Sequence, residues 1–361
     1  MTIDPQNGLI NRRFGPYILL SEIGCGAMAQ VYLGALPCAP KRMRFVALKC
    51  MHQAYQANPD YIRLFYHEAE IALGLMHPNL VETWSCGVIQ GRHTIVMDYL
   101  AGVSIGSLMS RGTIPIEVAL WIAINVLNGL SYLHEKTDDM GNPLGIVHRD
   151  LTPDNVIVGF DGTVRILDFG VSKCGVDVDD IQKGMMVGKY AYMSPEQCRG
   201  CDIDARSDVF SAAAVLYEMC TGHPAFARDT DIATIEALLN DEIVPPNRES
   251  WRFPSFLSQC IMQGLARDPD RRFHSARAFA DELATFVKLQ GMSDTQRKCQ
   301  SHIAQVCRDL IDSESNRMAT ATMAMQPYMP SIDDLISQGS SQPPDFTNNA
   351  LVLGEVTFSK L

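Results

Sequence analysis

The residues HRDLTPDN at positions 148–155 and DFG at positions 168–170 decide the interpretation of this chain. The first stretch places two aspartates and an asparagine within eight residues, and the second places an aspartate before a glycine. Carboxylate and amide oxygens are ligands that Mg²⁺ prefers, and a carboxylate beside a hydroxyl group can orient it and accept its proton. A set of unrelated polar loop residues is the alternative, and the joint order and spacing argue against it.

These residue types match the needs of phosphoryl transfer from ATP. That reaction requires oxygen ligands for magnesium and a carboxylate near the attacking hydroxyl. Asn155 and Asp168 can supply the magnesium ligands, and Asp150 can supply the carboxylate.

Two earlier segments carry weaker signals of the same chemistry. The sequence GCGAMAQV at positions 24–31 places glycines where backbone N–H groups can approach phosphates, although an ordinary hairpin has the same pattern. Lys49 ends the apolar strand VALK, where a lysine needs a partner, and Glu68 on the next expected helix is a candidate. A lysine that extends to solvent from an edge strand is the alternative.

Composition limits the class of protein. The chain has 361 residues, 47% of them hydrophobic and 20% charged, enough for two lobes with hydrophobic cores. A net charge of -11 argues against general nucleic-acid binding. Eleven irregularly spaced cysteines indicate reduced thiols in a cytoplasmic protein, and Cys198 with Cys201 has no second pair for a zinc site. The most apolar segment, 118–133, is short and interrupted by polar residues, so we expect a buried helix and no membrane span.

The order of expected elements changes along the chain. The first hundred residues read as a sheet with one helix at 61–75, and the strands are expected at 17–24, 31–34, 45–50 and 94–99. The proline-containing basic segment 35–44 reads as a surface loop. Helices dominate from about residue 104, and the expected ones are 118–133, 208–220, 251–265 and 275–287.

The last part of the chain has a different composition. Residues 290–361 are rich in Ser, Thr, Gln, Met and Pro. We expect one amphipathic helix there, followed by disorder after Ser313. Its apolar face would carry Ile303, Val306, Leu310 and Ile311. Hydroxyl side chains of this tail are either autophosphorylation or docking sites or part of an unmodified extension; examples are Ser315, Thr320, Thr322 and Ser331.

Together these motifs resemble the eukaryotic-like, Hanks-type serine/threonine protein kinases of bacteria, over roughly residues 17–287. The resemblance implies an α+β, bilobal fold. A small β-rich N-lobe would span about 17–100 and a larger helical C-lobe about 101–287. Residues 1–16 would be an N-terminal extension, and residues 288–361 a C-terminal tail.

The resemblance also implies roles for single residues. Lys49 would hold the α- and β-phosphates of ATP and pair with Glu68, Asp150 would be the catalytic base, and Asn155 and Asp168 would bind Mg²⁺. Met97 would stand at the back of the adenine pocket, with the backbone of Asp98 to Leu100 bonded to adenine. The full set of nucleotide-binding residues would be Ile23, Gly24, Gly26, Val31, Ala47, Lys49, Met97, Asp98, Leu100, Asn155 and Asp168.

Later matches separate the kinds of kinase. Ser194-Pro195-Glu196 is similar to the family's Ala-Pro-Glu, with Glu196 expected to pair with Arg272, and Asp208 matches the buried aspartate that supports the catalytic loop. Small-molecule kinases generally lack the first feature, and the catalytic loop lacks the Ala-Ala-Arg of tyrosine kinases. The expected partners are therefore protein substrates with serine or threonine acceptors, including the chain itself, with no nucleic acid and no membrane span. The sequence does not set an oligomeric state.

Two departures from the family are linked in our interpretation. The family usually has lysine at the position of Thr152 and threonine at the position of Lys189. We expect the Lys189 ammonium to reach the catalytic aspartate and stabilise the transferring phosphoryl group, with Thr152 as its neighbour. The alternatives are a Lys189 that points to solvent and slower catalysis, or a nucleotide-binding pseudokinase scaffold. Ala29 in place of a third glycine is expected to cost little.

The segment 171–193 is poor in hydroxyl groups. It has Ser172, Tyr190 and Tyr192 but no threonine. Three carboxylates can partly replace a phosphate that faces Arg149, and they are Asp177, Asp179 and Asp180. We therefore expect no requirement for phosphorylation in this segment, with a merely solvated acidic loop as the alternative.

Overall fold

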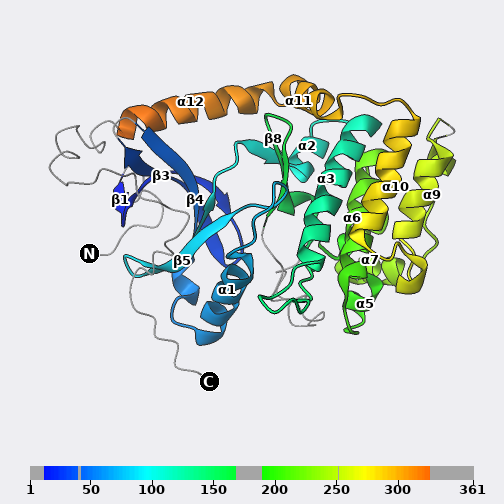
Figure 1. Cartoon of the computed structure of the whole chain (residues 1–361), viewed down its shortest axis with the longest axis horizontal. Helices are drawn as coiled ribbons and strands as arrows, with labels where there is room; N and C mark the ends of the chain where they lie inside the picture. Colours follow the sequence, from blue (N-terminus) through cyan, green and yellow to red (C-terminus); the bar gives the residue numbers. More distant parts are fainter. Residues whose placement is uncertain (1–11, 40–41, 168–188, 251, 326–361) are drawn as a thin grey trace. The chain divides into compact units, whose positions relative to one another are not determined.

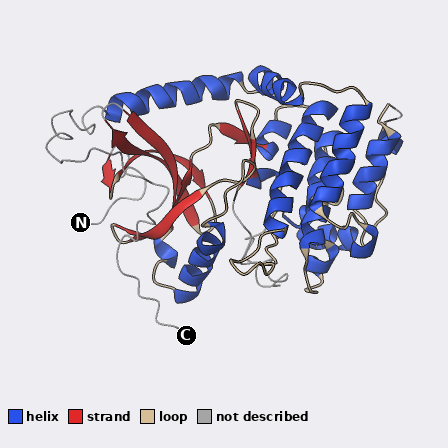
Figure 2. Ribbon diagram, viewed as in Figure 1, coloured by secondary structure: helices blue, strands red, loops and turns tan. Residues whose placement is uncertain are grey.

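The computed structural model describes residues 12–39, 42–167, 189–250 and 252–325. Contacts divide the chain into two compact units, whose elements are coloured along the sequence in Figure 1. The first unit takes residues 1–75, 82–99 and 312–361, and the second takes residues 76–81 and 100–311. The expected α+β class is confirmed, because the N-terminal part supplies a large sheet and the C-terminal part mainly helices (Figure 2).

The first unit is built on a six-stranded antiparallel sheet in the order β1-β2-β3-β4-β6-β5. Runs rich in branched and aromatic residues form these strands, and successive side chains point to opposite faces. The strands are β1 (Arg12–Phe14), β2 (Tyr17–Cys25), β3 (Ala29–Ala39), β4 (Arg42–Met51), β5 (Thr83–Ile89) and β6 (Arg92–Asp98).

Two expectations about this sheet need correction. The expected N-terminal extension contains β1, which pairs with β2 through a tight turn at Gly15, where φ is 59°. The expected surface loop at 35–44 is mostly strand, since β3 continues to Ala39. Pro37 is tolerated because β2 pairs with β3 only as far as Ala35, so beyond that point β3 has a free edge toward β2.

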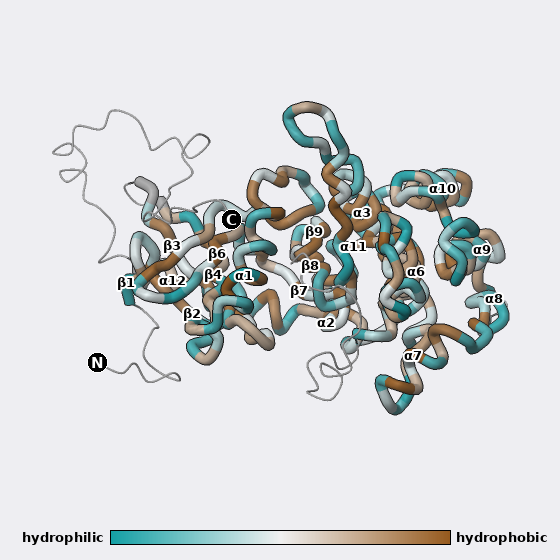
Figure 3. Tube along the Cα trace, turned by 90° about the horizontal axis from the view of Figure 1, so that it is seen from below, coloured by the Kyte–Doolittle hydropathy of each residue, from teal (hydrophilic) through white to brown (hydrophobic). Residues whose placement is uncertain are grey.

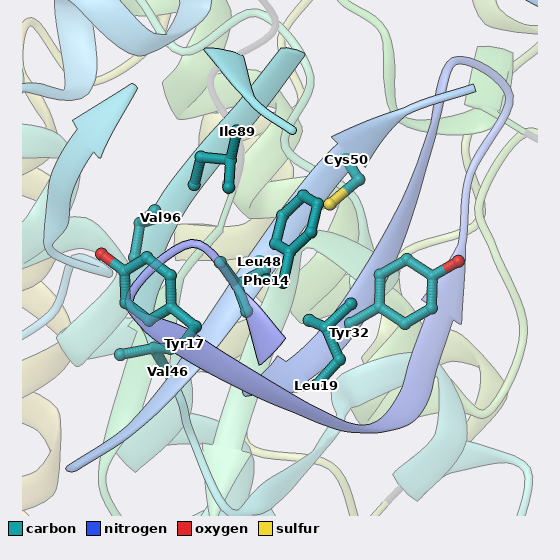
Figure 4. Packing of buried hydrophobic residues seen from close by; sticks show 9 residues of the cluster. All are labelled: Phe14, Tyr17, Leu19, Tyr32, Val46, Leu48, Cys50, Ile89 and Val96. Atoms are coloured by element: carbon teal, nitrogen blue, oxygen red, sulfur yellow. The ribbon is translucent and has the colours of Figure 1, made fainter. Parts of the chain in front are cut away.

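The sheet buries apolar side chains on both faces, which we name after two neighbouring residues of β4. The Leu48 face carries the cluster drawn in Figure 4; its residues are Phe14, Tyr17, Leu19, Tyr32, Val46, Leu48, Cys50, Ile89 and Val96. The Lys49 face carries a second cluster, with the buried residues Ile18, Leu20, Leu33, Ala35 and Ala321. Both sides are therefore covered, as the near-continuous apolar runs of β2 and β4 require.

A single long helix from the N-terminal part packs in this unit. Helix α1 (Pro59–Ala72) begins where the Asn58 side chain accepts a hydrogen bond from the amide of Asp60, with Pro59 in the first turn. Its buried residues are Phe65, Ala69 and Ala72, spaced at helical period. This helix confirms the one expected near 61–75.

The second unit is mainly helical. Its helices are α2 (Ile105–Met109), α3 (Ile116–His134), α5 (Pro195–Cys198), α6 (Ala205–Thr221), α7 (Asp231–Asn240), α8 (Pro246–Glu249), α9 (Ser255–Gly264), α10 (Ala276–Leu289) and α11 (Thr295–Val306). Helix α6 begins at the Asp204 side chain, which accepts from the amide of Arg206, and ends at Gly222, where φ is 83°. All four helices expected from the sequence are present.

Helix α3 lies at the centre of this unit. It contacts α6, α10 and α11, and its residues are coloured largely as hydrophobic in Figure 3. The helix is long and apolar enough to cross a membrane, but 61% of its apolar window is buried within the protein. Burial of this kind is typical of the core helix of a globular unit, as the sequence indicates.

A three-stranded sheet follows residues 148–155, the stretch expected to be catalytic and called the catalytic stretch below. Its strands are β7 (Gly102–Ser104), β8 (Val156–Gly159) and β9 (Val164–Ile166). The short 3-10 helix η2 (Pro153–Asn155) leads directly into β8. The sheet therefore holds the chain directly after residues 148–155, as far as Ile166.

The tail differs from the expectation of one helix followed by disorder from residue 314. It forms α11 and then α12 (Arg308–Met325), which breaks from α11 at Cys307. Helix α12 continues beyond Ser313 because its later turns bury side chains against the first unit, to which residues from Asp312 onward belong. Sequence reasoning missed this extension, since the tail is polar on average and its partner surface lies far away in the chain.

Candidate active site

Lys49 and Glu68 form the ion pair expected from the sequence. The Lys49 Nζ atom lies 2.5 Å from Glu68 Oε1, and the side chains are only 13% and 22% exposed. Lys49 stands on the central strand β4, opposite Val31 on β3 and Ile95 on β6. Glu68 lies on the side of α1 that also buries Phe65 and Ala69. The alternative of a lysine extending to solvent is therefore excluded for this strand.

The glycine turn between β2 and β3 keeps its backbone open. A Cβ atom placed on Gly24 or Gly26 would meet only ordinary contacts, the nearest at 3.8 Å and 3.5 Å, and neither glycine has a positive φ. The fold itself therefore does not require glycine at these positions. Their absent side chains leave the backbone accessible, as close approach of phosphate oxygens would need.

His52 fastens this turn and was missed by sequence reasoning. Its Nε2 atom lies 2.9 Å from the carbonyl oxygen of Gly26, and its amide donates to the carbonyl of Met28. The Cys25 Sγ atom lies 3.9 Å from the same ring nitrogen. Only its place three residues after Lys49 sets this histidine apart in the sequence.

The side chains expected around adenine share the Lys49 face of the sheet. Ala47 stands directly opposite Met97 on β6 and opposite Leu33 on β3. Ala47 and Met97 are 5% and 8% exposed. Ile23, at the far end of β2, packs at the edge of the apolar cluster on this face. Asp98, at the end of β6, pairs with Arg44 across 3.1 Å.

In the second unit, buried Asp208 holds the backbone of the catalytic stretch. Its Oδ2 accepts from the amide of His148 at 2.7 Å and its Oδ1 from the amide of Arg149 at 2.9 Å. His134 Nε2 lies 2.8 Å from the same carboxylate. Burial alone would raise the pKa of Asp208, but the His134 hydrogen bond and the charges of His134 and His148 hold that pKa below its usual range. Asp208 thus stays ionised, as its expected supporting role requires.

This contact stabilises an unusual backbone conformation. Arg149 has a φ of 66°, in the left-handed region that costs energy for a residue with a side chain. Besides Asp208, Gln197 holds the turn, since its Nε2 donates to the Arg149 carbonyl at 2.9 Å. Sequence reasoning missed Gln197.

The Asp150 carboxylate accepts hydrogen bonds from two of the expected site residues. Its Oδ2 accepts from Asn155 Nδ2 at 3.0 Å and from Lys189 Nζ at 3.0 Å, and the carboxylate is 11% exposed. Asn155 Nδ2 also donates to the Asp150 carbonyl at 2.7 Å. Since Nδ2 is committed to Asp150, Oδ1 is the Asn155 atom suited to a cation. Lys189 therefore contacts Asp150, the aspartate that we expect to act as the base.

Thr152 and Asp168 complete the predicted set. Thr152 is 5% exposed and lies immediately before η2. Asp168 lies outside the described residues, and so does the remainder of the DFG motif. Leu167, directly before it, donates its amide to the Asn155 carbonyl at 2.8 Å, and its own carbonyl lies 3.0 Å from His148 Nε2.

Glu196 and Arg272 form the expected pair, and it is buried. Two guanidinium nitrogens donate to the two carboxylate oxygens at 2.7 Å each, and Arg272 is 4% exposed. Ser207 Oγ donates to Glu196 at 2.5 Å. Burial would raise the pKa of Glu196, but the hydrogen bonds from Arg272 and Ser207 keep it below its usual value. The helix α5 is thereby fixed beside the catalytic stretch through Gln197.

Neither tyrosine that closely follows Lys189 has an exposed side chain. Tyr190 is fully buried, and the Tyr192 hydroxyl donates to Glu218 at 2.6 Å. Burial and the Glu218 carboxylate raise the pKa of Tyr192. Ser172 and the three aspartates at 177, 179 and 180 lie outside the described residues, so the expectation about that segment stays a prediction.

The chain matches the family model described as "Protein kinase domain" over residues 17–329. It is 37% identical over 279 residues to the tyrosine-protein kinase MasK of Myxococcus xanthus, covering 76% of this chain and 43% of that protein. It is 31% identical over 273 residues to a probable serine/threonine-protein kinase of Clostridium perfringens, covering 75% and 38%. The chain thus spans less than half the length of these curated relatives.

Solved structures agree with the sequence matches. The kinase domain of PknI from Mycobacterium tuberculosis superposes with a TM-score of 0.58 at 26% identity, covering 79% of this chain and 99% of that domain. The family model covers well over half of the chain, including the Lys49–Glu68 pair and the Asp150 cluster. The chain belongs to the protein kinase family.

Proposed function

We propose that this chain transfers the γ-phosphoryl group of ATP to serine or threonine hydroxyls of proteins. The observation that carries the proposal is the Asp150 carboxylate, held by Asn155 and Lys189 at 3.0 Å each on a strained turn. A carboxylate fixed in this way can orient an acceptor hydroxyl and take its proton as the new bond to phosphorus forms.

The residues of the first unit suit the nucleotide. Lys49, kept in place by Glu68, offers a cation for the α- and β-phosphates, and the open backbone at Gly24 and Gly26 offers amides. Ala47 and Met97 offer small or flexible apolar surface for adenine, with the backbone of Asp98 to Leu100 as its hydrogen-bonding edge.

The residues present also fit magnesium, which would neutralise charge on the phosphates. Asn155 has its amide nitrogen bonded to Asp150, which suits its oxygen to a hard cation. Asp168 is the next residue in the sequence after Leu167, whose amide is bonded to the Asn155 carbonyl. We therefore assign Asn155 and Asp168 as the two protein ligands.

Lys189 has a catalytic role in this proposal. Its ammonium contacts Asp150 and would stabilise the charge on the transferring phosphoryl group, a task that the family usually gives to a lysine at the position of Thr152. Thr152 is too short to do so, and it is buried beside the loop. The active-enzyme proposal is thus compatible with both departures.

One relative favours a second acceptor class. MasK, 37% identical, is named a tyrosine-protein kinase, whereas the relatives from clostridia and mycobacteria are named serine/threonine-protein kinases. Serine and threonine are preferred here because the catalytic loop reads Leu151-Thr152-Pro153 after Asp150, without the Ala-Ala-Arg of tyrosine kinases.

The test is transfer of labelled γ-phosphate from ATP with magnesium to the chain itself and to a generic basic protein, followed by identification of the labelled amino acid. We expect label on serine or threonine that disappears in Asp150→Asn. Label on tyrosine would reassign the acceptor. Nucleotide binding without any label would instead support a pseudokinase scaffold.

A further inference from the structure

The tail helix α12 places an acidic and apolar face against the sheet that carries Lys49. Glu314, Met318 and Ala321 follow one another at intervals of four and three residues, so they share one side of the helix. Ala321 is 4% exposed, and Met318 packs against the same cluster. The residues on the other side of the helix are exposed, among them Asp312, Ser313, Asn316, Thr320 and Met323.

The surface that α12 covers is the Lys49 face of the sheet. Its cluster includes Leu33 and Ala35 of β3, which stand opposite Ala47 and Phe45 of β4. Lys49 is on the same face two residues beyond Ala47, where Glu68 of α1 meets it. Helices α1 and α12 therefore hold the two ends of one face, and Ala47 lies between them.

Helix α12 also forms a hydrogen bond with residues 98–100, the segment proposed to bind adenine. The Tyr99 hydroxyl donates to Glu314 Oε1 at 2.6 Å, and Tyr99 packs against the apolar cluster together with Ile23. Burial and the Glu314 carboxylate raise the pKa of Tyr99, which keeps the phenol as the donor. Arg317 Nη1 lies 3.5 Å from Glu314 Oε2, so the carboxylate has a cationic partner besides Tyr99. Tyr99 lies between Asp98 and Leu100, so the hydrogen bond fixes the middle of the adenine-binding backbone.

The start of α12 is fixed independently, within the second unit. Arg111 forms a fork with both carboxylate oxygens of Asp309 at 2.6 Å and 3.0 Å and also donates to the Val306 carbonyl. Before it, the first turn of α11 lies so close to Gly162 that a Cβ there would meet the Gln296 carbonyl at 2.8 Å. The tail is thus a built element with specific contacts along its length.

We propose that α12 is a positioning element of the nucleotide site, in which Glu314 sets the adenine-binding backbone through Tyr99 and the Met318–Ala321 side supports the sheet beneath the base. The inference rests on the proposed function, since it assumes that ATP binds at Ala47, Met97 and the backbone of Asp98 to Leu100. It adds that the chain needs its own tail helix for tight ATP binding.

The experiment compares variants of the full chain by calorimetric titration with ATP and magnesium, and by kcat and KM for ATP. We expect Glu314→Ala to raise the Kd for ATP by about five- to tenfold, because Tyr99 loses a charge-assisted partner. The kcat at saturating ATP should change less than KM. Glu314→Gln, whose amide oxygen can still accept from Tyr99, should restore most of the affinity.

Matched controls separate positioning from a general loss of folding. Asp312→Ala removes a carboxylate from the exposed side of the same helix, and Thr320→Asp adds one there, next to Ala321. Both should leave the Kd within about twofold of wild type, whereas Ala321→Asp should raise it at least as much as Glu314→Ala. Hydrogen exchange of the amides at 95–100 should quicken in Glu314→Ala while the amides of α3 stay protected.

Two results would overturn the inference. If wild type binds ATP and Glu314→Ala binds it as tightly as Asp312→Ala, α12 does not position the site. If Glu314→Ala weakens binding but Glu314→Gln does so equally, the Tyr99 hydrogen bond is not the cause. A wild-type chain that fails to bind ATP would overturn the proposed function itself, a result distinct from both.

Discussion

Replacing Lys189 by methionine tests the most unusual part of the site. The variant keeps an apolar side chain of similar length but removes the ammonium that lies 3.0 Å from Asp150 Oδ2. A Coulomb interaction at this distance is about 5.5 kcal/mol at an effective dielectric constant of about 20. Lys189 is 36% exposed, so solvent screening reduces this value substantially.

The expected loss is therefore that of one preorganised electrostatic contact. We expect kcat to fall about 100-fold, which corresponds to about 2.7 kcal/mol of transition-state stabilisation. KM for ATP should change by less than about threefold, because Lys49 rather than Lys189 is assigned to the phosphates of bound ATP. Thermal unfolding should show that the variant remains folded.

A double-mutant cycle identifies the cause of that loss. Lys189→Thr should be as slow as Lys189→Met, and adding Thr152→Lys should recover activity, because the cation then comes from the position that the family uses. Initial rates of labelled phosphate transfer at saturating ATP measure all four proteins. Additive effects of Thr152→Lys and Lys189→Thr would refute the exchange, and so would a Lys189→Met variant within threefold of wild type.

Three further predictions concern stability and reactivity. Arg272→Met leaves Glu196 buried without its partner and should lower the free energy of unfolding by about 3–5 kcal/mol in urea titrations. The pKa of Glu196 is depressed below its ordinary value of 4.5, so its contribution to folding stability is present above that pH and is lost as the pH falls further. Wild type should therefore lose more stability on acidification than Glu196→Gln. Equal losses would contradict the assignment. Burial raises the pKa of Cys198 to about 12, so at pH 8 iodoacetamide should label it far more slowly than exposed Cys25 and Cys201, as mass spectrometry of the native protein can show.

The catalytic stretch was predictable because its information is local. Asp150 and Asn155 are five residues apart and meet through a hydrogen bond across a single turn. The pairs Lys49–Glu68 and Glu196–Arg272 join distant residues, yet the resemblance to a known family supplied both. Both contacts involve buried charges. A buried charge needs an oppositely charged partner, so only a few residues of a sequence are candidates for each.

The contacts of β1 and α12 depend on surfaces that no local sequence pattern predicts. Strand β1 has three residues, of which only Phe14 is buried. One buried residue cannot show the alternation that predicts a strand. Helix α12 buries Ala321 and half-buries Met318 and Glu314, a face without the large apolar residues that mark a core helix. The helix is stabilised by packing on a sheet whose residues lie more than two hundred positions earlier in the sequence. The periodicity of the tail sequence does not predict this packing.

The way the expected site residues of each unit are held explains what substitutions should do. In the second unit, buried carboxylates fix the catalytic turn: Asp208 binds two consecutive amides at the strained Arg149, and Glu196 anchors the helix whose Gln197 binds the Arg149 carbonyl. These contacts form without a bound substrate, so under the proposed function their residues should act on kcat. In the first unit, by contrast, Lys49 and the adenine-binding backbone depend on helices that dock on one sheet face, and Glu314 is one hydrogen bond away from Tyr99. If ATP binds as we propose, changes there should act first on ATP affinity, and substitutions in the tail helix should alter nucleotide binding without touching Asp150.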